Sequence, residues 1–253
     1  MDYSEKLSRL RLIRTPNVGQ ITARLLLRRY GSASEALLHL PELSARGGRK
    51  IRLAGKADAE AELEKLTTFG GEMIIYGSAD YPAALRRFDD APFCFSIKGH
   101  KTLLNRPMLA IVGARNASLN AHKFAEKLAR ECGEAGYVIV SGLARGIDTA
   151  AHKGSLATGT IAVIAGGIDV VYPSENQALY EQIGEMGILL AEMPFGTQPS
   201  ARLFPIRNRI IASLVKGCLV VEAAERSGSL ITANDAAERG AEVMALPGSP
   251  IDP

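Results

Sequence analysis

The chain has 253 residues, of which 47% are hydrophobic and 23% charged, an ordinary globular composition long enough for one large and one small domain. A formal net charge of +3 favours anionic partners only slightly. No apolar stretch reaches membrane-spanning length, and the N-terminus lacks the basic-then-apolar layout of a signal peptide. We therefore expect a cytoplasmic protein that does not insert into membranes.

Residues 1–66 predict a small all-helical domain. Apolar residues recur at helical spacing over 5–12, the segment Thr15–Gly19 interrupts them, and a second helix runs over 21–30 with Ile21, Leu25 and Leu26 on one face. Ser34 is the expected cap of a third helix. Two helices joined by a Pro/Asn/Gly hairpin resemble a helix-hairpin-helix or SAM-like element, which offers hairpin N–H groups to DNA phosphates. A helical domain that only packs fits the same residues.

The remainder, residues 67–253, predicts an α/β domain. It opens with two short strand-like runs at 73–76 and 93–97 and then alternates regularly between strands and helices. The strands are apolar and the crossovers long, which is typical of a mostly parallel sheet covered by helices on both faces, an extended Rossmann-like fold. The expected strands are 108–112, 137–140, 160–164, 188–190, 218–221 and 242–246. The expected helices are 118–135, one that follows the turn 141–148 and ends at about 156, 176–186, 204–216, and one that follows the turn 222–229 and ends at 239.

Glycine-containing turns follow four of these strands. They lie at Gly113, at Gly142 with Gly146, at Gly166 with Gly167, and at Gly228. Right-handed crossovers place every strand-to-helix turn at the same carboxyl edge of a parallel sheet, where backbone N–H groups and helix N-termini bind anions. We expect the four turns to converge on one crevice.

The sequence lacks the characteristic motifs of several enzyme classes. The chain has no P-loop, no G-x-G-x-x-G after a strand and no G-x-S-x-G elbow, so we expect no catalytic residues and no cofactor. Asp148 and His152 are spaced to pair on one helix, which favours a helix-face hydrogen bond over a catalytic dyad. The four histidines share no metal-ligand spacing, so we expect no metal site. The cysteines are far apart, and we expect Cys94 and Cys218 to be buried free thiols.

Basic and polar residues gather at the predicted carboxyl edge. Arg115, Arg145 and Arg226 fall in its turns, and a helix there begins with Phe204-Pro-Ile-Arg-Asn-Arg209. Each cation in the first turn of a helix interacts unfavourably with the helix dipole, at a cost of ~0.3–1 kcal/mol. An anion bound at that end would offset this cost. Several such turns suit a polyanion threaded across the edge. Phe204 either stacks on a base or packs under its helix.

Five motifs in this order resemble the bacterial DNA-processing family known as DprA or Smf. The resemblance covers about residues 70–250. The motifs are Gly113-Ala-Arg-Asn-Ala-Ser118, Ser141-Gly-Leu-Ala-Arg-Gly-Ile-Asp148 with Ala151-His152, Ala165-Gly-Gly-Ile-Asp169 with Tyr172-Pro173, Phe204-Pro-Ile-Arg-Asn-Arg-Ile-Ile211, and Val221-Glu-Ala223 with Ser227-Gly-Ser-Leu-Ile-Thr-Ala233.

The resemblance implies a non-enzymatic protein of natural transformation. Such proteins bind and protect incoming single-stranded DNA, help to load the RecA recombinase onto it, and form homodimers. The implied DNA-binding residues are Arg115, Ser118, Arg145, Lys153, Phe204, Arg207, Asn208, Arg209, Ser227, Gly228, Ser229 and Arg239. Ala241 stands where the family usually has an arginine after a glycine, which weakens the basic patch near Arg239. The chain also stops soon after Pro250, so we expect a fragment lacking the family's usual C-terminal tail and winged-helix region.

The sequence is also compatible with two other functions. The fold also resembles the LOG-type phosphoribohydrolases, which cleave the base from a nucleoside monophosphate through a Pro-Gly-Gly-x-Gly-Thr loop and a nearby glutamate. The matching region here, Glu222–Ser229, lacks the paired glycines. The third function is an interaction module whose basic crevice holds the acidic tail of another protein.

Overall fold

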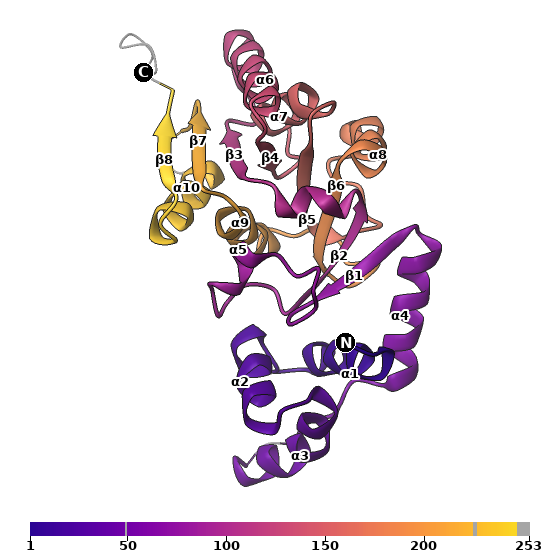
Figure 1. Cartoon of the computed structure of the whole chain (residues 1–253). Coiled ribbons are helices and arrows are strands. Elements are labelled where there is room, and N and C mark those ends of the chain that lie inside the picture. Colours follow the sequence, from indigo (N-terminus) through magenta and orange to yellow (C-terminus); the bar gives the residue numbers. More distant parts are fainter. Residues whose placement is uncertain (49, 225–226, 247–253) are drawn as a thin grey trace. The chain divides into compact units, whose positions relative to one another are not determined.

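The computed structural model describes residues 1–48, 50–224 and 227–246, and the chain divides into two compact units, residues 1–96 and 97–253. The first unit is mainly helical (Figure 1). Its elements are α1 (Tyr3–Arg14), α2 (Gln20–Tyr30), α3 (Ala33–Arg46), α4 (Lys56–Thr68), β1 (Gly71–Ile75), α5 (Ala83–Arg86) and β2 (Cys94–Gly99), the last of which continues into the second unit. The all-helical start is thus confirmed, while the domain boundary at residue 67 stays a prediction.

Two details of the first unit correct the sequence-based prediction. Ser32, not Ser34, caps α3, since its side chain accepts a hydrogen bond from Glu35 N at 3.1 Å. Of the three residues predicted to share the apolar face of α2, Ile21 and Leu25 are exposed and only Leu26 is buried. Ala23 and Arg24 are the other buried residues of this helix. Arg24 can be buried because its guanidinium donates to the carbonyls of Asp89 and Ala91, both at 2.7 Å, which satisfies polar hydrogens that burial would otherwise leave unpaired.

The second unit is built on a parallel sheet with the strand order β6-β5-β4-β3-β7-β8. From β3 the chain moves outward through β4, β5 and β6, and then returns to the other side of β3 for β7 and β8. The strand order therefore reverses between β3 and β7, the position at which open α/β sheets usually bind ligands. The strands are β3 (Met108–Gly113), β4 (Val138–Ser141), β5 (Thr160–Gly167), β6 (Ile188–Met193), β7 (Gly217–Val221) and β8 (Glu242–Ala245).

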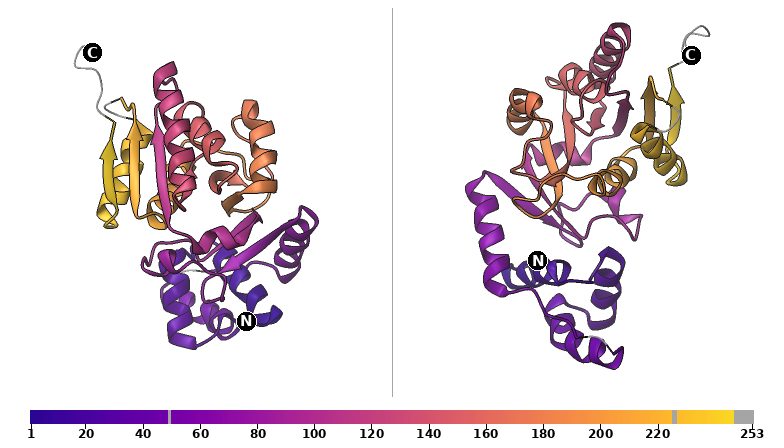
Figure 2. Two further views of the ribbon diagram at one scale, coloured as in Figure 1. Left: turned by 45° about the horizontal axis from the view of Figure 1, so that its top comes forward. Right: turned by 180° about the vertical axis from the view of Figure 1, so that it is seen from behind.

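Helices cover both faces of this sheet, as the two views in Figure 2 show. One face carries α6, α7 and α8, and the opposite face carries α9 and α10. The helices are α6 (Leu119–Glu134), α7 (Ile147–Ser155), α8 (Gln177–Met186), α9 (Leu203–Leu214) and α10 (Gly228–Glu238), with short 3₁₀ turns η1 (Lys101–Asn105) and η2 (Ser174–Asn176). The predicted Rossmann-like fold is confirmed. Among the described residues, no helix has the length and apolar character needed to cross a bilayer.

Small residues let these layers approach closely. Ala121, Ala125 and Ala129 recur every fourth residue on α6 and are buried against α7 and the sheet. Ile111 and Ile139 of the central strands complete this core, each contributing about 1.5–3 kcal/mol by burial. The predicted buried thiols of Cys94 and Cys218 are confirmed.

Candidate functional site

Two adjoining cavities of about 240 and 220 Å³ lie at the carboxyl edge of the second unit's sheet. We call them together the edge crevice. The turns after β3 and β4, the end of β5 and the start of α10 all line it, so the predicted convergence of the four glycine-containing segments is confirmed. Both cavities share the residues Arg115, Ala144, Phe204 and Arg207.

Gly113, the last residue of β3, lines the crevice, and only glycine fits at this position. A Cβ on Gly113 would lie 1.9 Å from the carbonyl oxygen of Val221 in the neighbouring strand β7. The chain can therefore leave the sheet directly and place Arg115 at the crevice mouth. Arg115 is exposed, and its guanidinium carbon lies 5.4 Å from the centre of the Phe204 ring. Among the described residues no carboxylate forms an ion pair with Arg115.

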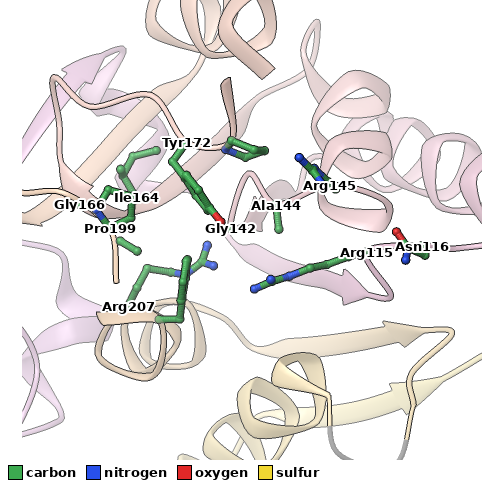
Figure 3. Close-up of a pocket in the computed structure, with 13 residues that line it drawn as sticks. Arg115, Asn116, Gly142, Ala144, Arg145, Ile164, Gly166, Tyr172, Pro199 and Arg207 are labelled. Carbon is green, nitrogen blue, oxygen red and sulfur yellow. The ribbon is translucent and has the colours of Figure 1, made fainter. Parts of the chain in front are cut away.

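An aromatic pair forms one wall of the crevice. Tyr172 follows β5, is 47% exposed, and its ring centre lies 5.9 Å from that of Phe204 at the start of α9. In Figure 3, Arg115 and Arg207 extend towards each other beneath Tyr172. Planar π-faces beside guanidinium groups suit an unstacked base with its phosphate.

Arg207 is the buried cation of the crevice. It is only 7% exposed, and its Nη1 donates to the carbonyl of Val163 at 3.0 Å. Gly142 makes room for it, because a Cβ at that position would lie 1.6 Å from Nη1. Burial lowers the pKa of Arg207, which the nearby Asp148 carboxylate opposes. Burial likewise raises the pKa of Asp148, and the Arg207 charge opposes that rise.

Asp148 and His152 do not pair as the sequence allowed. Asp148 Oδ2 accepts from the backbone N–H groups of Gly142 and Ala144, at 3.1 and 3.3 Å. His152 is fully buried, and its Nδ1 lies 2.7 Å from Thr160 Oγ1. Burial, together with the positive charge of Arg207, lowers the pKa of His152 to about 3, so the ring stays neutral. Asp148 lines the smaller cavity and holds the loop after β4, whereas His152 lines neither cavity.

The start of α10 contributes the second wall. Ser227 precedes the helix without capping it, and its hydroxyl lies 2.7 Å from that of Ser229. The Asn208 amide bridges from α9 to the carbonyl of Gly228 at 3.3 Å. These hydroxyl groups and the free N–H groups of a helix N-terminus favour an anion in this cavity. The predicted turn arginine, Arg226, lies outside the described residues, as do residues 247–253.

Four of the predicted DNA-binding residues lie away from the crevice. Ser118 caps α6 at a neighbouring groove, where its N–H and hydroxyl both donate to the Glu222 carboxylate and thereby lower the pKa of Glu222. Lys153 is exposed on α7, and Arg239 follows the far end of α10; neither lines the crevice. Arg209 turns inward to form an ion pair with Glu192.

The structure therefore brings together eight of the twelve predicted residues. They are Arg115, Arg145, Phe204, Arg207, Asn208, Ser227, Gly228 and Ser229. That any of the twelve contacts DNA stays a prediction. Sequence reasoning passed over Tyr172 as a site residue, although an aromatic residue just after a strand's carboxyl end would have been a usable signal.

Two family models cover nearly the whole chain. The model described as DNA recombination-mediator protein A matches residues 72–253, and the DprA-like N-terminal HHH domain matches residues 3–64. The chain belongs to the DprA/Smf family. The predicted resemblance is thereby confirmed, and it extends to the helical first unit.

Curated relatives and solved structures agree with this family. The DNA processing protein DprA of Streptococcus pneumoniae is 48% identical over 174 residues, covering 68% of this chain and 61% of the relative. That of Bacillus subtilis is 45% identical over 187 residues, covering 73% and 63%. The chain thus matches about three-fifths of the length of these relatives.

Two solved DprA structures resemble this chain. The X-ray structure of the S. pneumoniae protein superposes with a TM-score of 0.72 at 43% identity, covering 78% of this chain and 69% of that one. The DprA of Helicobacter pylori, whose structure is described for its single-stranded DNA binding mode, gives a TM-score of 0.67 at 28% identity, covering 72% and 83%.

Proposed function

We propose that this chain binds single-stranded DNA across the edge crevice, protects it during natural transformation and helps to load RecA recombinase onto it. The observation that carries the DNA-binding step is the placement of Arg115 and Arg207 against Phe204 and Tyr172 at the point where the strand order reverses. Family membership and the single-stranded DNA binding mode of the H. pylori relative support the same step.

Preference for single strands follows from the aromatic wall. The rings of Phe204 and Tyr172 can stack only on bases that are not already stacked in a duplex. The arginine contacts would bind phosphates of any sequence, because phosphate contacts carry no base information. Binding should therefore be strong for single strands, indifferent to sequence and sensitive to salt.

The acidic groups around the crevice support binding rather than catalysis. Asp148 is taken up by two backbone N–H groups, and Glu222 by Ser118. The bonds from Ser118 engage both Glu222 oxygens and lower its pKa, which makes it a weaker base, and the bonds to Asp148 Oδ2 use that side chain to hold the loop after β4 in place. We therefore propose that the chain is not an enzyme, and release of adenine from AMP would contradict this.

The partners of the whole protein form a further part of the proposal. We infer that the protein acts in the cytoplasm as a homodimer and contacts RecA. Family membership supports these points, and the chain matches only part of the length of its relatives. Pull-down of RecA by the chain with bound oligo-dT tests the contact.

Fluorescence anisotropy with labelled oligo-dT and a matched duplex tests the binding step. Tyr172→Ala should weaken single-strand binding by roughly 5- to 100-fold, the equivalent of losing one stacked base, and Tyr172→Phe should keep it. Equal affinity for duplex and single strand in the wild-type chain would contradict the proposal.

A further inference from the structure

The loop between β4 and α7 presents Arg145 from a backbone that is held on two sides. Asp148 accepts from the N–H groups of Gly142 and Ala144, and the buried Asn176 donates from Nδ2 to the carbonyl of Leu143 at 3.0 Å. Because this backbone is anchored, the position of the Arg145 guanidinium depends on what that group binds.

Glu175, the residue before Asn176, binds the Arg145 guanidinium. Its Oε1 forms an ion pair with Arg145 Nε, and the hydrogen bond from Arg145 lowers the pKa of Glu175. The two side chains are 61% and 46% exposed. An ion pair this open to solvent is weak and screened by salt, so another anion can take the place of the carboxylate.

The pair lies beside the crevice. Arg145 lines the larger cavity, and Tyr172 and Pro173, just before the turn that carries Glu175, form part of its wall. Arg115 has no ion-pair carboxylate among the described residues, whereas Arg145 already has one. A phosphate chain entering the crevice would therefore find Arg115 available and Arg145 occupied.

We propose that Glu175 is an internal competitor for Arg145 that sets the affinity of the edge crevice for a phosphate chain. The inference rests on the proposed function. When a phosphate displaces the carboxylate, Arg145 exchanges one anion for another, so the net gain from this contact is small. Without the Glu175 charge, the same contact contributes fully.

A double-mutant cycle over a salt series with labelled oligo-dT tests this. Glu175→Gln should bind roughly two- to five-fold more tightly at low salt, with a salt slope steeper by about 0.7, as for one added phosphate contact on a single strand. Arg145→Gln alone should change affinity little, and Glu175→Gln should bring no gain in the Arg145→Gln background. Glu185→Gln removes the same charge from α8, away from the crevice, and controls for net charge.

The outcomes separate this inference from the proposed function. Wild-type binding with no gain in Glu175→Gln, or a gain that persists without Arg145 or appears equally in Glu185→Gln, would overturn the role of Glu175 alone. No binding by the wild-type chain would overturn the proposed function and this inference with it. Because both residues are exposed, all variants should keep the wild-type melting temperature.

Discussion

Arg115 and Arg209 carry the same charge and were predicted, from the first and fourth motifs, to bind DNA, yet the structure gives them opposite roles. Arg209 Nη2 lies 2.6 Å from both carboxylate oxygens of Glu192, and the side chains are only 16% and 5% exposed. Replacing Arg209 by Ala takes this cation away from a buried carboxylate. Breaking a buried ion pair from one side costs about 3–5 kcal/mol.

That loss should lower the melting temperature by roughly 6–20 °C for a unit of this size. Thermal unfolding followed by circular dichroism measures it. Arg202→Ala is the matched control, since it removes an exposed arginine at the start of the same helix and should stay within about 0.5 kcal/mol of the wild type. Replacing both partners with apolar residues, Arg209→Met with Glu192→Leu, should recover much of the loss.

The reasoning is refuted if Arg209→Ala melts with the wild-type chain while losing its DNA affinity. Arg209 would then act on the ligand directly. We expect the reverse pattern for Arg115→Ala, which should keep the wild-type melting temperature and lose affinity.

Four further predictions concern Gly142, His152, Glu222 and Cys218. Gly142→Ala should destabilise the chain by about 1–3 kcal/mol, because its Cβ would displace the Arg207 guanidinium; unchanged thermal unfolding would contradict this. The folded chain holds His152 at a pKa of about 3 against an ordinary 6.5, so stability should be constant above pH 6.5 and fall below it by up to about 1.4 kcal/mol per pH unit, as urea unfolding at pH 7, 6 and 5 can measure. The lowered pKa of Glu222 gives stability above the ordinary glutamate pKa that is lost as pH falls through the lowered value. The difference in melting temperature between Ser118→Ala and the wild type should therefore be larger at pH 7 than at low pH, where only the loss of the α6 cap remains. Burial raises the pKa of Cys218 to about 12, so iodoacetamide at pH 8 should alkylate it only after unfolding, as mass spectrometry of the digested protein would show.

The strands and helices of the second unit could be predicted because their residues carry local patterns. The run Met108–Val112 is apolar throughout, and the motif glycines mark the strand ends. One extent was underestimated, since β5 continues through Ala165 to Gly167 where the sequence predicted a turn. Paired glycines favour a turn locally, but here they extend the strand because the 194–199 segment lies against them and Gly167 N donates to the carbonyl of Thr197.

The pairing of the charged side chains could not be predicted. Ser118 meets a glutamate 104 residues away, and Arg209 one that is 17 residues away on another element. No local pattern encodes such contacts, because the fold alone brings those elements together. Sequence reasoning therefore found the crevice, and eight of the twelve predicted residues line it. It could not tell Arg115, which has no carboxylate in an ion pair with it among the described residues, from the internally paired Arg145 and Arg209.

The most direct test of the account is the affinity of the wild-type chain and Arg115→Ala for labelled oligo-dT over a salt series. We predict salt-dependent binding by the wild type, weaker binding by Arg115→Ala at every salt concentration, and a salt slope shallower by about 0.7 in the variant, as for one lost phosphate contact. Identical affinities and slopes in the two proteins would contradict the assignment of the edge crevice as the DNA-binding site.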